Sequence, residues 1–149
     1  MSVEEHVGLL NAVILNLLIV AVVVLIHHEV LLRLSTATAK MRQSHRFRLI
    51  LAVFGVLLAH TAQVWIFACA YYFMHHGDGW GALAGNFNGS LLDCVYFSFS
   101  TFTTLGYGDI EAFGNLRFLT GIEGLTGLVL ITWSASFLFV EMQRYWPTR

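Results

Sequence analysis

The sequence is poor in charge, in proline and in cysteine. Only 11% of its 149 residues are charged, whereas a soluble domain has roughly 25%. The net charge of −1 excludes a nucleic-acid binder of the usual basic kind. The one proline is Pro147, so proline breaks no helix before that position. Cys69 and Cys94 form no Cys-x-x-Cys pair, so neither a zinc site nor a redox motif is indicated.

The sequence instead contains long runs of apolar residues. Hydrophobic residues make up 57% of the chain, and the mean hydropathy is +0.70. A helix needs about 20 apolar residues to cross the hydrocarbon of a bilayer. Three segments are long enough, so the sequence predicts an all-α membrane protein with three transmembrane helices. These segments are Val7–Ile26, continued by an apolar run at Val30–Leu32, then Leu49–Met74, and Phe118–Val140.

The stretch between the second and third spans has two parts. Residues 75–90 carry five glycines and are expected to form an exposed loop. Residues 91–103 are apolar, but about 12 residues suit a re-entrant segment better than a crossing. Ser90 followed by Asp93 is the S-x-x-D pattern of a helix start. We therefore expect a short pore helix that enters the membrane, followed by a segment that returns to the same side.

The run TTLGYGD, Thr103–Asp109, follows this short helix. Gly106 and Gly108 permit φ values that other residues resist, so the backbone can twist alternately. Carbonyl oxygens turned inward from such a backbone can replace the water around a monovalent cation. The run resembles the selectivity filter of potassium channels. The resemblance implies an ion-coordinating filter of Thr104, Leu105, Gly106, Tyr107 and Gly108, with the ion at the carbonyls of the first four and the Thr104 hydroxyl at the inner end.

The segment YFSFSTFTTLGYGDI, Tyr96–Ile110, resembles the pore loop of small bacterial potassium channels with two transmembrane helices and a pore loop. The downstream run IEGLTGLVLITWSASFLF resembles their inner helix. The resemblance implies a potassium-selective channel, with K⁺ as its bound ion and no other cofactor. One chain supplies one pore loop and four loops close such a pore, which implies a homotetramer. The first span would be an extra N-terminal helix.

The resemblance also implies which residues support the filter. An aromatic residue and a glutamate behind the filter often bond the aspartate at its outer end. The aspartate here is Asp109 and the aromatic residue is Tyr96, but Ser100 occupies the glutamate position. Leu105 stands where valine is most frequent, and only its carbonyl would face the ion. The expected supporting residues are Thr103, Asp109, Tyr96 and Ser100.

The third span holds candidate gating residues. Gly127 lies near the hinge position of the family, and it also repeats with Gly121 and Gly124 at helical spacing. It is therefore expected to be a close helix contact, a hinge, or both. If it is a hinge, a pore-facing stripe follows it, and Phe139 is the candidate constriction near the cytoplasmic mouth. The stripe consists of Leu128, Ile131, Ala135 and Phe139.

Two polar residues inside the spans are candidate modulators. Glu123 is the one acidic residue in the three segments and needs a partner, since a charge in the membrane is costly. It is expected either to hydrogen-bond the pore helix or a neighbouring subunit, or to sense protons or ions. His60 is more often a satisfied polar group of a helix core than a ligand.

Basic residues predict the orientation of the chain. Five of the eight lie between the first and second spans, and residues 75–90 have none. Positive residues mark the cytoplasmic side, so the N-terminus is expected outside and the C-terminus in the cytoplasm of a multi-pass protein of the plasma (inner) membrane. The first helix lacks a basic n-region and is expected to be retained. Membrane lipids are the expected partners besides K⁺, and nucleic acid is not.

The predicted organisation has four parts. They are an N-terminal transmembrane helix (1–33), a basic cytoplasmic loop (34–48), a pore domain (49–140), and a cytoplasmic tail (143–149). The pore domain divides into an outer helix (49–74), an extracellular loop (75–90), a pore helix (91–103), the filter (104–109) and an inner helix (116–142).

Three alternatives stay open at this stage. The chain could form a weakly selective monovalent cation channel, since a filter sequence alone does not guarantee a rigid filter. It could be a regulatory channel subunit that conducts nothing by itself. A membrane enzyme would need a set of catalytic residues at one depth, and the sequence shows no such cluster.

Overall fold

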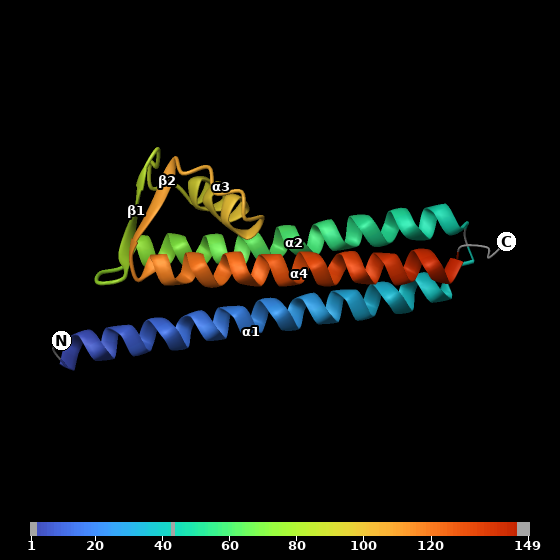
Figure 1. Ribbon diagram of the computed structural model, residues 1–149, viewed down its shortest axis with the longest axis horizontal. Helices are drawn as coiled ribbons and strands as arrows, with labels where there is room; N and C mark the ends of the chain where they lie inside the picture. The colour runs from blue at the N-terminus through green and yellow to red at the C-terminus, as the bar shows by residue number, and fades with distance from the viewer. Residues whose placement is uncertain (1–2, 43, 146–149) are drawn as a thin grey trace.

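The computed structural model describes residues 3–42 and 44–145. In chain order, its elements are α1 (Val3–Lys40), α2 (His45–His76), β1 (Gly81–Gly85), α3 (Leu91–Phe102), β2 (Ile110–Gly114) and α4 (Leu116–Tyr145). The three long helices run side by side along the long axis of the molecule, and α3 gathers with both strands toward one end (Figure 1).

The three long helices are membrane-length. Leu10–Lys40, Arg46–His76 and Leu116–Arg144 are each long and apolar enough to cross a bilayer. Helix α3 has 12 residues, a length of about 18 Å, which is too short to cross. Many large apolar side chains on α1, such as Leu10, Leu17 and Leu25, are exposed. An apolar helix with an exposed surface suits hydrocarbon rather than water, so the fold is the all-α membrane fold that the sequence predicts.

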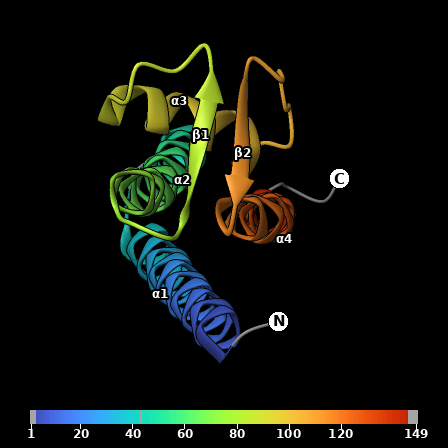
Figure 2. The ribbon, with the colours of Figure 1, turned by 90° about the vertical axis from the view of Figure 1, so that its left-hand side faces the viewer.

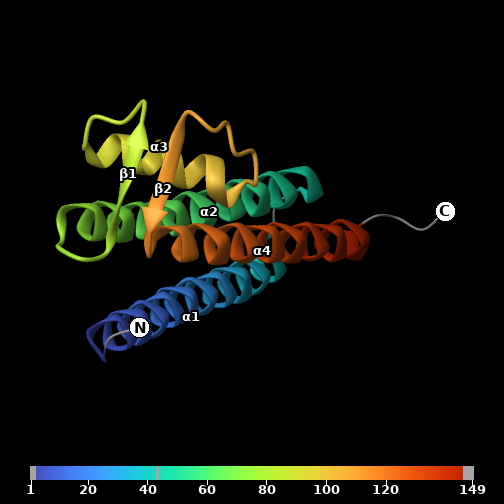
Figure 3. The ribbon, with the colours of Figure 1, turned by 60° about the vertical axis from the view of Figure 1, so that its left-hand side comes forward.

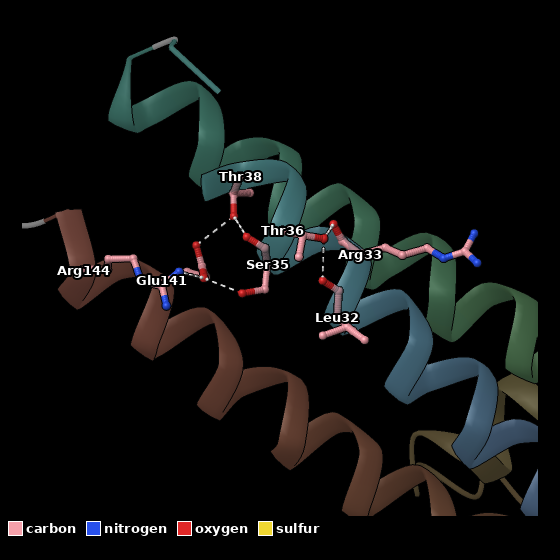
Figure 4. Close-up of polar contacts among 7 residues, drawn as sticks. All are labelled: Leu32, Arg33, Ser35, Thr36, Thr38, Glu141 and Arg144. Carbon is pink, nitrogen blue, oxygen red and sulfur yellow. Dashed lines mark hydrogen bonds and ion pairs between the residues drawn. The ribbon is translucent and has the colours of Figure 1, made fainter. Parts of the chain in front are cut away.

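The predicted basic loop at 34–48 is wrong in extent. Helix α1 continues to Lys40 and α2 begins at His45, so the connection is only residues 41–44. No glycine or proline interrupts residues 34–40, and the last turns of α1 dock on α4. Figure 4 shows Ser35 and Thr38 facing Glu141, with the Thr38 hydroxyl donating to its carboxylate at 3.0 Å. These contacts favour continued helix over a loop.

Both spanning helices of the predicted pore domain are longer than the sequence predicts. The outer and inner helices were expected at 49–74 and 116–142, and the structure has α2 at His45–His76 and α4 at Leu116–Tyr145. The first part of the predicted tail is therefore helical. Residues 146–149 of that tail, residues 1–2 of the predicted N-terminal unit and residue 43 of the predicted loop lie outside the described residues.

The helices form three layers. Seen from the end of the bundle, α3 lies on one side of the α2–α4 pair and α1 lies on the opposite side (Figure 2). The view in Figure 3 shows the same arrangement. Side chains from α2, α3 and α4 pack into one core that includes Phe67, Tyr71, Cys94, Phe102 and Leu119, all fully or almost fully buried. This core fixes α3 against the two membrane-length helices.

A two-stranded sheet, called the hairpin below, is formed by the strand before α3 and the strand after it; the sequence analysis did not predict it. Strands β1 and β2 pair antiparallel, from Gly81 opposite Gly114 to Gly85 opposite Ile110. A Cβ at Gly85 would lie 2.4 Å from the Asp109 carbonyl oxygen, and its φ is +101°. Only glycine fits both restrictions. The hairpin joins the chain before α3 to the chain after residue 109, which holds the two ends of the α3 excursion together.

Candidate functional site

Helix α3 begins where its sequence predicts. The Ser90 side chain accepts a hydrogen bond from the Asp93 backbone N–H at 3.1 Å, as an N-cap does. The Asp93 carboxylate in turn accepts from the Asn88 backbone N–H at 2.8 Å. These bonds satisfy backbone donors at the start of the helix and fix the direction in which α3 leaves the hairpin.

The segment after α3, residues 103–109, has a backbone that alternates in handedness. Thr104, Gly106 and Gly108 have φ of 59°, 57° and 78°, and among the described non-glycine residues only Thr104 has a positive φ. A Cβ added at Gly106 or Gly108 would meet nothing within 4 Å. Glycine is therefore required there by backbone conformation and not by lack of space. The alternation that the sequence predicted is present.

Ser100 of α3 holds this segment from behind. Its carbonyl accepts from the backbone N–H groups of Leu105 at 2.9 Å and Gly106 at 3.2 Å. Its hydroxyl accepts from the Tyr107 backbone N–H at 3.2 Å. Three consecutive N–H groups therefore point back toward one buried residue. Ser100 is one of the residues that the sequence analysis expects to support this segment, and the structure adds the contacts, three hydrogen bonds to consecutive backbone N–H groups, which the sequence did not specify.

This anchoring determines where the carbonyl groups point. In a trans peptide the C=O of one residue lies opposite the N–H of the next. Because the N–H groups of residues 105–107 face α3, the carbonyls of Thr104, Leu105 and Gly106 face away from it. The structure contains no cis peptide among the described residues. The open side of the segment therefore presents a row of carbonyl oxygens, and the residues 104–108 themselves are exposed in the single chain.

The outer end of the segment is tied to α3 and to the hairpin. The Tyr96 hydroxyl donates to Asp109 Oδ2 at 2.9 Å, and the Tyr96 and Tyr107 rings stack with centroids 6.1 Å apart. The hydrogen bond to Asp109 raises the pKa of Tyr96 above its ordinary value, because the carboxylate stabilises the protonated phenol. The Asn86 backbone N–H donates to the Asp109 carbonyl at 2.8 Å. The structure thus brings together the Tyr96 and Asp109 pair that the resemblance implied.

Glu123 of α4 is completely buried beneath α3. Its carboxyl group accepts from the Tyr71 hydroxyl at 2.6 Å and contacts the Ser98 hydroxyl at 2.5 Å. The Ser98 hydroxyl also lies 2.9 Å from the Val64 carbonyl oxygen. One carboxyl group therefore joins α2, α3 and α4. The partner on the pore helix that the structural interpretation of Glu123 required is Ser98.

Gly127 lies where α4 packs closely against the end of α3. A Cβ at Gly127 would lie 2.0 Å from the Phe102 carbonyl oxygen, whereas one at Gly124 would lie 3.7 Å from the nearest atom, the Thr101 carbonyl oxygen. At Gly121 nothing lies within 4 Å. Of the three repeating glycines, Gly127 is therefore the one that the packing within this chain requires.

A recess of about 420 Å³ lies between the 103–109 segment and α4. Thr104 and Gly106 line it on one side and Gly121, Gly124 and Leu128 on the other. Further along α4, the other residues of the predicted stripe, Ile131, Ala135 and Phe139, are exposed in the single chain. The predicted ion-coordinating segment and the beginning of the stripe therefore border the same space.

His60 lies away from this recess and is bonded to side chains of α2 and α4. No group of three or more His, Cys, Asp or Glu residues that could hold a metal ion occurs among the described residues.

Comparison with known proteins identifies the family. Residues 49–144, more than half of the chain, match the family model described as ion channel. No curated protein and no solved structure matches the chain. The matched region contains α3, the 103–109 segment and nearly all of α2 and α4, and it excludes α1. The chain therefore belongs to the ion channel family whose members have two transmembrane helices and a pore loop, with α1 as an additional N-terminal helix.

Proposed function

We propose that four copies of this chain surround one axis and form a potassium-selective channel. The observation that carries the proposal is the anchoring of three consecutive N–H groups on Ser100. It turns the carbonyls of Thr104, Leu105 and Gly106 to the open side of the segment. Four such rows facing one another would supply rings of carbonyl oxygens, which is how potassium channels replace the hydration shell of the ion.

Residues 104–108 would be the selectivity filter, with K⁺ held at Thr104, Leu105, Gly106 and Tyr107. The Thr104 hydroxyl would add an oxygen at the inner end. Thr103, Tyr96, Ser100 and Asp109 would support this conformation from behind. K⁺ is the transported ion, and the proposal requires no cofactor.

The tetramer would cover apolar surface that one chain leaves exposed. Leu105 and Tyr107 are 62% and 65% exposed, and Leu92 on α3 is 70% exposed. These side chains border an apolar hollow beside the filter segment. Burying them against a neighbouring copy favours association, and one pore loop per chain cannot close a ring by itself.

The charge pattern supports an orientation in the plasma membrane. Arg42, Arg46 and Arg48 lie in or beside the α1–α2 connection, at the end of the bundle opposite the hairpin (Figure 1). We place this end in the cytoplasm, so the N-terminus and the hairpin face outside. The C-terminal end of α3 would then direct its partial negative charge toward the recess beneath the filter.

We place the gate on α4. Gly127 would serve as a contact or a hinge, and Ile131, Ala135 and Phe139 would continue the pore-facing stripe. Glu123 and His60 are the candidate modulatory residues behind it.

Purified protein in liposomes tests the proposal. We expect K⁺ efflux from loaded liposomes that barium blocks, and loss of efflux in Gly106→Ala, because alanine resists the φ of 57° at this position. Gly124→Ala is the matched control, since a Cβ there makes only an ordinary contact. Equal Na⁺ and K⁺ flux would indicate a weakly selective channel. No flux from an assembled tetramer would indicate a regulatory subunit. Either result contradicts the proposal.

A further inference from the structure

A second cluster of buried polar side chains lies on the α1 side of the bundle, away from the conduction site. It joins three helices: His27 from α1, His60 and Gln63 from α2, and Ser134 from α4. His27 and Gln63 are fully buried and Ser134 is 3% exposed. Polar groups at membrane depth need partners inside the protein. The cluster is therefore one of two polar attachments of α1, the helix outside the family match, to the pore domain; the other joins Ser35 and Thr38 to Glu141.

The four side chains contact one another in a closed circuit. Gln63 Nε2 lies 3.0 Å from His27 Nδ1, and Gln63 Oε1 lies 2.9 Å from His60 Nδ1. Ser134 Oγ lies 3.0 Å from His60 Nε2 and 3.4 Å from His27 Nε2. The two imidazole rings stack with centroids 5.3 Å apart. Every ring nitrogen of both histidines therefore has one partner within the circuit.

Counting protons fixes the protonation state of the circuit. A neutral imidazole has one donor and one acceptor nitrogen, and the serine hydroxyl has one proton. Gln63 donates to His27 Nδ1, so His27 carries its proton on Nε2 and donates to Ser134. Ser134 then donates to His60 Nε2, and His60 Nδ1–H donates back to Gln63 Oε1. Reversing the Gln63 amide reverses every bond and leaves the rule unchanged: both imidazoles are neutral and they are opposite tautomers.

A proton added to either histidine breaks this circuit. A charged imidazole has two donors and no acceptor, so two donors would face each other at Gln63 or the Ser134 proton would lose its acceptor. The nearby charged or titratable groups on the packed helices have partners outside the circuit. Glu123 bonds Tyr71 and Ser98, and Glu29 pairs with Arg33. Glu141 bonds Ser35, Thr38 and Arg144, and the His28 ring lies against Trp133. The contact from α3 is the apolar ring of Phe102.

We propose that His27, Gln63, His60 and Ser134 form a latch that holds α1 against the inner helix only while both imidazoles are neutral, and that acidification releases it. The sign follows from the proton count: the contact is intact at high pH and is lost as pH falls. Ser134 lies two turns beyond Gly127 on α4, so release frees α4 below the filter. His27 and His60 are thus positioning residues, which act on conduction through Ser134 and do not touch the ion.

Histidine-selective ¹⁵N NMR of the full chain in lipid bilayers tests the latch without any ion flux, so its result is independent of the proposed function. His27→Gln and His60→Gln identify the two signals by their loss. At about pH 8 we expect one imidazole protonated on Nδ1 and the other on Nε2, and at about pH 5 we expect a charged imidazole. Two like tautomers, a charged ring at the higher pH, or signals unchanged between the two pH values would overturn the proposal.

The pH profile of ion flux tests the coupling to conduction. Glutamine has an N–H₂ group that donates and an oxygen that accepts, and it does not titrate, so the double variant His27→Gln/His60→Gln should lose the pH response. His28→Gln is the control, because His28 is exposed and makes no bond in the circuit. We expect wild type and the control to share a pH response that Ser134→Ala weakens. An identical response in the double variant, or no response in wild type, would overturn the coupling.

Discussion

Replacing Gly127 by alanine should displace the pore helix from the inner helix. The added methyl carbon would lie 2.0 Å from the Phe102 carbonyl oxygen, 2.8 Å from its carbonyl carbon and 3.0 Å from its Cα. All three are backbone atoms, so no side chain can rotate away to relieve the clash. The end of α3 must move, and Phe102 is two residues before Thr104.

The expected magnitude comes from two opposing effects. Forcing a methyl group into packed structure costs about 1–3 kcal/mol, while glycine to alanine within a helix contributes about 0.5–1 kcal/mol of stability. Gly124→Ala gains the helix stabilisation without the clash, because the added Cβ would lie 3.7 Å from its nearest neighbour, the Thr101 carbonyl oxygen. We therefore expect Gly127→Ala to be less stable than Gly124→Ala by about 1–3 kcal/mol per subunit.

Thermal unfolding of the two variants in the same detergent measures this difference, and the K⁺/Na⁺ permeability ratio reports the filter. Gly127→Ala should show the lower unfolding temperature and the weaker selectivity. If it is as stable and as selective as Gly124→Ala, the contact does not constrain α3. Unchanged stability with altered open probability would instead favour Gly127 as a hinge.

Three further changes follow from the same contacts. Ser100→Ala removes the acceptor of the Tyr107 N–H, worth about 1 kcal/mol, and should shorten conducting openings in single-channel records; Ser100→Thr keeps the hydroxyl and should not. Glu123→Ala removes the 2.6 Å acceptor of the buried Tyr71 hydroxyl, at about 1–3 kcal/mol, while the Ser98 hydroxyl keeps the Val64 carbonyl. It should lower the unfolding temperature of the tetramer more than Glu123→Gln does, and equal effects would contradict the role of Glu123 in joining α2, α3 and α4. Phe139→Ala should raise single-channel open probability if this residue is the constriction, and an unchanged value would remove it as a gate.

Local sequence patterns predicted the elements that are determined locally. Apolar length predicted the three membrane-length helices, the S-x-x-D pattern predicted the cap at Ser90, and the spacing of Gly106 and Gly108 predicted the alternating backbone. The family match then supported the ion channel interpretation. Each of these features depends on residues that lie close together in the sequence.

Features that depend on distant contacts were missed. The sequence predicts the α1–α2 loop at 34–48 because the apolar runs end at Leu32 and resume at Leu49, but Thr38 bonds Glu141 at a separation of 103 residues. The pairing of β1 with β2 was not predicted because the two strands are separated in the sequence by α3 and the 103–109 segment. The sequence analysis assigns no role to His27, yet this residue contacts Ser134, 107 residues away. No local pattern encodes such pairs.

The reversal potential in a gradient of K⁺ on one side and Na⁺ on the other tests the central claim most directly. Purified protein in planar bilayers supplies the current, and the Gly106→Ala variant supplies the background. With equal concentrations of the two ions, carbonyl rings at residues 104–107 predict a reversal potential far from zero, with the K⁺ side negative, and a current that barium blocks. A reversal potential near zero would contradict a potassium-selective filter at these residues.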